Sequence, residues 1–113
     1  MVNKTGTVWE YACRDYLQAM GLTVLRAAGS HGAADLIAWD EKDVLLIQCK
    51  KESVKKSYGG DVRRLREMVC PKEWRRQLWV KSGRGAYIYD LGDNITSEID
   101  MKIMRGKSRE VKE

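Results

Sequence analysis

The sequence predicts a single mixed α/β domain, and the order of its hydrophobic patterns supports this fold class. Two stretches with apolar residues at helical spacing, 5–20 and 61–70, alternate with strand-like runs at 22–27, 34–51, 77–81 and 86–91. The length of 113 residues suits one domain, and no repeat or second domain is visible. We therefore expect one domain over 1–113, with a core over about 5–91 and a partly disordered C-terminal extension over 92–113.

The composition indicates a soluble, cytoplasmic protein with affinity for phosphate groups. No apolar run is as long as a membrane span, and no signal-peptide pattern opens the chain, so no membrane is expected. The three cysteines are widely spaced and lack a CxxC pair, which argues against a disulfide framework or a zinc site. Residues 50–84 hold twelve Lys and Arg against four Asp and Glu, a surplus of eight. Such a basic tract favours nucleic-acid binding, with a solvated helix surface as the ordinary alternative.

The first predicted helix runs from about residue 5 to Met20, because Gly21 can end it. Its buried stripe consists of residues at helical spacing: Trp9, Cys13, Tyr16, Leu17 and Met20. Glu10 lies beside this stripe, near Arg14, so a surface ion pair between the two is one interpretation of Glu10.

Residues 22–27 alternate well enough to form a first strand that ends near Arg26. We expect Arg26 to pair with a carboxylate or with a phosphate. The small residues at 27–33 permit close approach of the backbone to a phosphate. This segment carries Ser30, which can be a simple turn hydroxyl. It also carries His31, which can contact a phosphate, act as a general acid or base, or have no role.

Residues 34–51 form two apolar runs joined by a charged turn at 40–43. If that turn has four residues, Trp39 faces Val44, and Asp35 then stands opposite Gln48. Alternation places Lys50 on the same face, and the Cβ atoms of opposed residues are about 5 Å apart. A carboxylate, an amide and an ammonium group therefore converge at one end of the hairpin.

This group of side chains suits a hard cation. Mg²⁺ prefers oxygen ligands and often takes only one or two carboxylates from a protein. Asp35 would be the main ligand, Gln48 the second, and the backbone carbonyl of Cys49 the third. Lys50 would lie beside a metal-bound water or stabilise charge that develops on a phosphate. The ordinary alternative is a hairpin whose end residues simply face solvent.

A second helix is predicted over 61–70, with Asp61 as its cap and Pro71 after its end. Its apolar side comprises Val62, Leu65, Met68 and Val69. Tyr58, just before the helix, can stack on DNA or cover the core. The expected DNA contacts in this region are Lys51, Lys55, Lys56, Tyr58, Arg63, Arg64 and Arg66.

Two further strands, 77–81 and 86–91, flank a turn at 82–85 and complete the predicted sheet. At least one aromatic residue of this part is expected at a dimer surface, from the set Trp74, Trp79, Tyr87 and Tyr89. A short amphipathic helix is predicted beyond Gly92 from the spacing of Ile95, Ile99, Ile103 and Met104. The polar tail over 105–113 is predicted to be disordered.

Asp35, followed by Gln48-Cys49-Lys50 at the end of an apolar strand, resembles the PD-(D/E)xK nuclease superfamily. The order and spacing over roughly residues 5–90 are similar to the archaeal-type Holliday junction resolvases within it, through Trp9-Glu10, Val24-Leu25-Arg26 and Gly29-Ser30-His31-Gly32. The sequence departs from the family pattern at two positions. Ala34 stands where the family has proline, and Gln48 stands where it has an acidic residue.

The resemblance implies a restriction-endonuclease-like domain of order αβββαβ with a mixed central β-sheet. It implies a metal-dependent, structure-selective endonuclease that makes paired symmetric nicks in four-way, branched double-stranded DNA. The implied cofactor is Mg²⁺, with Mn²⁺ as a substitute and no small-molecule cofactor. It places Glu10 at the metal site with Asp35 and Gln48, and it gives Ser30 a catalytic role. Because a four-way junction has two-fold symmetry, we expect a homodimer with two active sites.

Three alternatives stay open. Another endonuclease of the superfamily, of the restriction type or a flap- or branch-cutting enzyme, would share these motifs. A non-catalytic DNA-binding module would keep the basic tract, with Gln48 marking a weakened metal site. Glutamine at that place also occurs in some restriction-type relatives, so activity is expected. A structural or protein-interaction domain is the third alternative.

Overall fold

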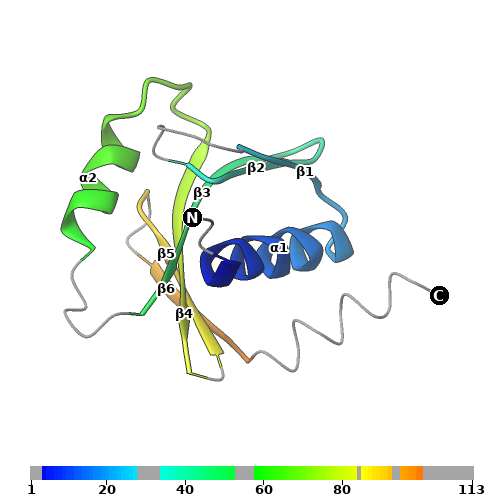
Figure 1. Ribbon diagram of the computed structural model, residues 1–113. Helices are drawn as coiled ribbons and strands as arrows, with labels where there is room; N and C mark the ends of the chain where they lie inside the picture. The colour runs from blue at the N-terminus through cyan, green and yellow to red at the C-terminus, as the bar shows by residue number, and fades with distance from the viewer. Residues whose placement is uncertain (1–3, 28–33, 53–57, 84, 93–94, 101–113) are drawn as a thin grey trace.

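The computed structural model describes residues 4–27, 34–52, 58–83, 85–92 and 95–100, with the side chains of 4–7, 95, 99 and 100 excepted. These residues form one mixed sheet with a helix on each face (Figure 1). The elements are α1 Lys4–Ala19, β1 Thr23–Arg26, β2 Leu36–Trp39, β3 Val44–Lys51, α2 Gly59–Glu67, β4 Arg75–Ser82, β5 Gly85–Asp90 and β6 Ile95–Asp100. The predicted fold class and its αβββαβ order are confirmed, the further strand predicted over 86–91 is β5, and β6 is an additional strand.

The strands lie in the spatial order β1-β2-β3-β4-β5-β6. Strands β3 and β4 are parallel, and every other neighbouring pair is antiparallel. A parallel pair needs a crossover connection, and α2 lies in the crossover between β3 and β4. Neither helix of the described part is long and apolar enough to cross a membrane.

The hairpin formed by β2 and β3 has the predicted register. Trp39 faces Val44, and the ladder continues to Leu36 opposite Ile47. One step further along this register brings Asp35 level with Gln48. The turn therefore lies at one end of the hairpin, and the polar side chains lie at the other end.

The turn at 40–43 is held by the Asp40 carboxylate. Its Oδ1 accepts hydrogen bonds from the backbone N–H groups of Lys42 and Asp43, each at 2.8 Å. The Asp40 N–H also donates to the carbonyl of Asp43 at 3.0 Å. These bonds fix the loop length, and the loop length fixes which residues of β2 and β3 face each other.

The core has two parts, one on each face of the sheet. On the α1 face it comprises Trp9, Cys13, Leu17, Leu36, Ala38, Ile47, Cys49, Trp79 and Ala86. On the α2 face it comprises Ala34, Leu46, Leu65, Leu78 and Val80. Because side chains alternate along β3, this division puts Gln48 and Lys50 on the α2 face.

Helix α1 packs against the sheet through residues spaced four apart. Trp9, Cys13 and Leu17 are each at most 4% exposed. The Trp9 indole Nε1 donates to the backbone carbonyl of Trp79 at 3.2 Å, so this polar atom is not buried without a partner. The helix ends before Gly21, whose φ of 98° favours glycine, as predicted.

The second helix differs from its prediction at both ends. It begins at Gly59 with Tyr58 as the N-cap residue, so Asp61 lies inside the first turn and is not the cap. It ends at Glu67, because Met68 has an extended backbone with ψ of 132°. Val69 is fully exposed, so its placement on the apolar side was wrong.

The amphipathic helix predicted beyond Gly92 is wrong where the structure describes the chain. Residues 95–100 form β6, which pairs with β5 and extends the sheet beyond the predicted core boundary at residue 91. The open edge of β5 offers a full set of backbone hydrogen bonds, whereas a short isolated helix is marginal in water. Residues 101–113, including Ile103 and Met104, lie outside the described part.

Candidate active site

Asp35 lies just before β2 and is tied to both neighbouring strands. Its N–H donates to the carbonyl of Ile47 at 2.8 Å, and its carbonyl accepts from Ala27 N–H at 2.8 Å. Its carboxylate Oδ2 accepts from the backbone N–H of Cys49 at 2.9 Å. The carboxylate is therefore aimed at the end of β3, where Gln48 and Lys50 flank Cys49, as predicted.

Glu10, on α1, approaches the same strand ends from the other face of the sheet. Its Oε1 accepts from Arg26 Nε at 2.8 Å, and the two side chains are 19% and 27% exposed. The predicted pairing of Arg26 with a carboxylate is thus confirmed. The alternative pairing of Glu10 with Arg14 is wrong, because Arg14 binds the neighbouring Asp15 carboxylate at 2.9 Å.

The two carboxylates influence each other. Burial raises the pKa of Asp35 above its ordinary value, and the negative charge of Glu10 adds to this rise. The hydrogen bond from Cys49 and the positive charges of Lys50 and Arg26 oppose it. A bound cation would relieve the repulsion between Glu10 and Asp35, since its positive charge would favour the charged form of Asp35.

These donors fit Mg²⁺ better than a softer metal. Among the described residues, no three His, Cys, Asp or Glu side chains gather closely enough to hold a metal ion by themselves, as a structural zinc site requires. Two carboxylates with amide and carbonyl oxygens form a donor set that Mg²⁺ accepts. A hydrogen bond with Cys13 and burial raise the pKa of the Cys49 thiol, so this thiol stays neutral behind the site.

Asp61 holds Lys50 in place, and the sequence interpretation missed this role. Its Oδ1 lies 3.3 Å from Lys50 Nζ and 2.8 Å from Arg64 Nη2. The Asp61 side chain is only 10% exposed, whereas that of Lys50 is 38% exposed. Lys50 therefore lies between two acidic groups, Asp35 and Asp61. The available signal was an acidic residue at the start of a basic helix, which was interpreted as a cap.

The structure describes only some of the predicted DNA contacts. Lys51, Arg63, Arg64 and Arg66 are exposed, as a DNA-binding surface requires. Tyr58 is partly buried against the core on the α2 face, which agrees with its alternative role as a cover. The remaining candidates lie outside the described residues: Ser30, His31, Lys55 and Lys56.

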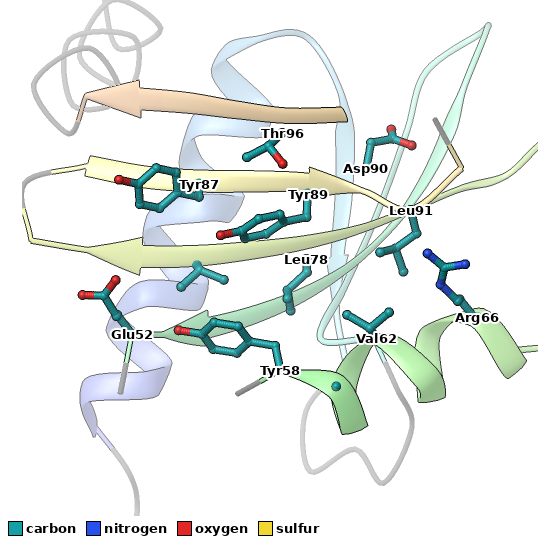
Figure 2. Close-up of a pocket in the computed structure, with 12 residues that line it drawn as sticks. Glu52, Tyr58, Val62, Arg66, Leu78, Tyr87, Tyr89, Asp90, Leu91 and Thr96 are labelled. Atoms are coloured by element: carbon teal, nitrogen blue, oxygen red, sulfur yellow. The ribbon is translucent and has the colours of Figure 1, made fainter. Parts of the chain in front are cut away.

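A cavity of about 460 Å³ lies between α2 and the sheet. Figure 2 shows Tyr58 and Val62 on one side of it, with Leu78 and Tyr89 on the other. The β3–β4 register sets Gln48 beside Leu78, so the cavity begins one strand away from the metal-site candidates. Neither Asp35, Glu10 nor Gln48 lines it, and it is separate from the candidate site.

The mixed sheet with a helix on each face, and the acidic and basic side chains at the adjoining ends of β2 and β3, agree with the predicted restriction-endonuclease-like fold class. The sequence model described as "Archaeal holliday junction resolvase (hjc)" matches residues 1–69. The chain therefore belongs to the archaeal Holliday junction resolvase family and is a nuclease that resolves Holliday junctions, with branched DNA as its substrate.

The solved structures agree on the fold. Hjc of Archaeoglobus fulgidus, described as a Holliday junction resolvase from an archaeal hyperthermophile, matches with a TM-score of 0.63 at 18% identity. The match covers 88% of this chain and 92% of that chain. A comparison with curated proteins found no match.

Proposed function

We propose that this nuclease is a Mg²⁺-dependent endodeoxyribonuclease that resolves four-way DNA junctions by paired symmetric nicks, with Mn²⁺ able to replace Mg²⁺. The observation that carries the proposal is the meeting of Asp35, Glu10 and Lys50 at one end of the sheet. A carboxylate pair beside an ammonium group suits hydrolysis of a phosphodiester, because it can hold a cation and stabilise an anionic transition state.

The cation would be held by the Asp35 and Glu10 carboxylates, the Gln48 side-chain oxygen and the Cys49 carbonyl. When bound, Mg²⁺ supplies Lewis acidity and lowers the pKa of water. The Cys49 N–H fixes the orientation of Asp35, and Arg26 fixes that of Glu10. Gln48 is neutral, so the electrostatic attraction for the cation would come from the Asp35 and Glu10 carboxylates.

Lys50 is the residue we assign to charge stabilisation. Its Nζ is held by Asp61 at 3.3 Å, and its positive charge also reaches Asp35. An ammonium group in this position stabilises negative charge on the phosphate oxygens during attack. Ser30 is proposed as a further catalytic residue.

The basic side chains would then hold the DNA backbone around the cut. The proposed phosphate contacts are Arg26, His31, Lys51, Lys55, Lys56, Arg63, Arg64 and Arg66, with Tyr58 against a base or sugar. A homodimer would present two such sites to the two strands of a symmetric junction. We also propose that the enzyme acts in the cytoplasm without a small-molecule cofactor.

The test is cleavage of a synthetic four-way junction and of a matched linear duplex, each with Mg²⁺, Mn²⁺ or EDTA. We expect paired symmetric nicks in the junction that need the metal and are lost in Asp35→Asn. Equal cutting of linear or flap DNA would favour another endonuclease of the superfamily. Junction binding without any cutting in Mg²⁺ or Mn²⁺ would favour a non-catalytic binding module.

A further inference from the structure

Tyr11, on the outer side of α1, contacts two arginine side chains. The Cζ atom of Arg14 lies 4.7 Å from the centroid of the Tyr11 ring, and the Cζ atom of Arg26 lies 5.1 Å from it. Both distances are within the range of a cation–π contact. The outer side of α1 is open to solvent at this position, since Tyr11 is 39% exposed. We call Tyr11, Arg14 and Arg26 the Tyr11 stack.

The Tyr11 stack adjoins the candidate active site through Arg26. The guanidinium group that contacts the Tyr11 ring is the same one that donates to Glu10 at 2.8 Å. If Glu10 turns toward a cation, Arg26 gives up part of this ion pair. The ring contact is independent of Glu10, so it keeps Arg26 in place during that exchange.

Arg14 is the second cation of the stack, and its carboxylate partner is easily replaced. Its ion pair with Asp15 is between side chains that are 36% and 47% exposed. Exposed ion pairs contribute little to stability, because water and salt screen them. A DNA phosphate, which accepts two hydrogen bonds from one guanidinium group, can therefore compete with Asp15 for Arg14.

An aromatic ring suits this task because it holds a cation without satisfying its hydrogen bonds. The ring face attracts the guanidinium plane, so the N–H groups at its edge can bind a carboxylate, as they do with Asp15 and Glu10, or a phosphate in its place. The two guanidinium carbons both lie about 5 Å from the centroid of one ring, so a single side chain holds two positive charges that an anion can approach.

We propose that Tyr11 is a positioning residue that presents Arg14 and Arg26 to the phosphates of the DNA strand beside the cut. This inference rests on the proposed nuclease function and adds Arg14 and Tyr11 to the DNA contacts. It sets a phosphate-binding surface on the α1 side of the site, opposite the basic residues of α2. The substrate strand is therefore held from both faces of the sheet.

The test is binding of a fluorescent four-way junction over a range of salt concentrations, with Ca²⁺ replacing Mg²⁺. The variants are Arg14→Gln, Tyr11→Leu and Tyr11→Phe. Lys42→Gln is the matched control, because Lys42 is an exposed cation in the turn at the far end of the hairpin. Thermal melts establish that each variant folds, and Arg14→Lys serves as a second variant that keeps the charge.

Arg14→Gln should weaken binding several-fold and reduce the slope of log K against log salt by about 1, the value for one lost phosphate contact. Tyr11→Leu should weaken binding in the same direction, because leucine fills the space without holding the cations. Tyr11→Phe should retain binding, since it keeps the ring. Lys42→Gln should leave the slope unchanged.

Three results would overturn the inference: a wild-type slope for Arg14→Gln, equal binding by Tyr11→Leu and Tyr11→Phe, or an equal loss of slope in Lys42→Gln. These outcomes are distinct from a failure of the proposed function. Wild-type protein that binds the junction but never cuts it contradicts the nuclease proposal alone. The slopes of log K against log salt then still test the role of the Tyr11 stack. Wild-type protein that does not bind the junction contradicts both.

Discussion

Replacing Gln48 by glutamate should make the stability of the protein depend strongly on Mg²⁺. The hairpin register sets residue 48 level with Asp35 on the same face of β2 and β3. Gln48→Glu would therefore put a second carboxylate on the face of Asp35, with the two Cβ atoms about 5 Å apart, while Glu10 already repels the Asp35 carboxylate. Without a divalent cation, the new carboxylate faces Asp35 across the hairpin, and Lys50 on the same face offsets only part of the repulsion.

The expected magnitude follows from Coulomb's law. Two unit charges about 5–6 Å apart repel by about 1–3 kcal/mol for effective dielectric constants between 80 and 20. In EDTA the free energy of unfolding should fall by about that amount, which lowers Tm by several degrees for a domain of this size. In Mg²⁺ the extra carboxylate attracts the cation. If it raises the affinity for Mg²⁺ tenfold, saturating Mg²⁺ restores about 1.4 kcal/mol of the free energy of unfolding.

Thermal unfolding monitored by circular dichroism, in EDTA and in millimolar Mg²⁺, measures both effects. Gln18→Glu, an exposed position on α1, is the matched control for adding one negative charge. Its Tm should shift little and should not respond to Mg²⁺. If Gln48→Glu responds to Mg²⁺ no more than the wild type or this control, then residue 48 does not face a cation site and the metal assignment fails.

Three further predictions concern Asp61, Leu65 and Asp40. Asp61→Asn should lower the free energy of unfolding in urea by about 1–2 kcal/mol and slow junction cleavage, because Lys50 loses its partner. Leu65→Ala should lower the free energy of unfolding by about 2–5 kcal/mol in the same assay, since Leu65 lies on the buried side of α2 and is fully buried. Hydrogen bonds from the N–H groups of Asp43 and the residue before it hold the pKa of Asp40 below its ordinary value of 3.8. The stability from ionised Asp40 is therefore present at neutral pH and is lost as pH falls below that value. Between pH 7 and pH 3, the wild-type Tm should fall more than that of Asp40→Ala.

Each of these has a clear opposing result. Cleavage by Asp61→Asn at the wild-type rate would show that the ion pair does not position Lys50. A loss below about 1 kcal/mol for Leu65→Ala would mean that α2 packs loosely on the sheet. Parallel pH curves for wild type and Asp40→Ala would show that the Asp40 carboxylate does not stabilise the turn.

The hairpin was predictable because its register depends on two local quantities, the alternation of apolar residues and the length of the turn. Four polar residues at 40–43 specify the pairing of Trp39 with Val44, and the remaining pairs follow from it. Asp35, Gln48 and Lys50 were placed on one face by the same counting. The α1 stripe was predictable for a similar reason, since helical periodicity alone selects Trp9 and Cys13.

The rest depended on contacts between separate elements. Asp61 meets Lys50 only because α2 crosses over β3, and Tyr11 meets Arg26 only because α1 packs beside β1. Neither contact can be derived from the local sequence alone. Residues 95–100 were misassigned because isoleucines four apart match a helix, whereas the unpaired edge of β5 decides in favour of a strand.

The balance of charge at the site gives a physical reason for glutamine at position 48. Three acidic side chains, Glu10, Asp35 and Asp61, lie among three basic ones, Arg26, Lys50 and Arg64. These charges sum to zero, and an acidic residue at 48 would leave one negative charge in excess. A cation held by Glu10 would compete with Arg26 for this carboxylate and would leave Arg26 available to a phosphate. Glutamine at position 48 would then lower the attraction for Mg²⁺ but avoid repulsion with Asp35, and the response of Gln48→Glu to Mg²⁺ measures both effects.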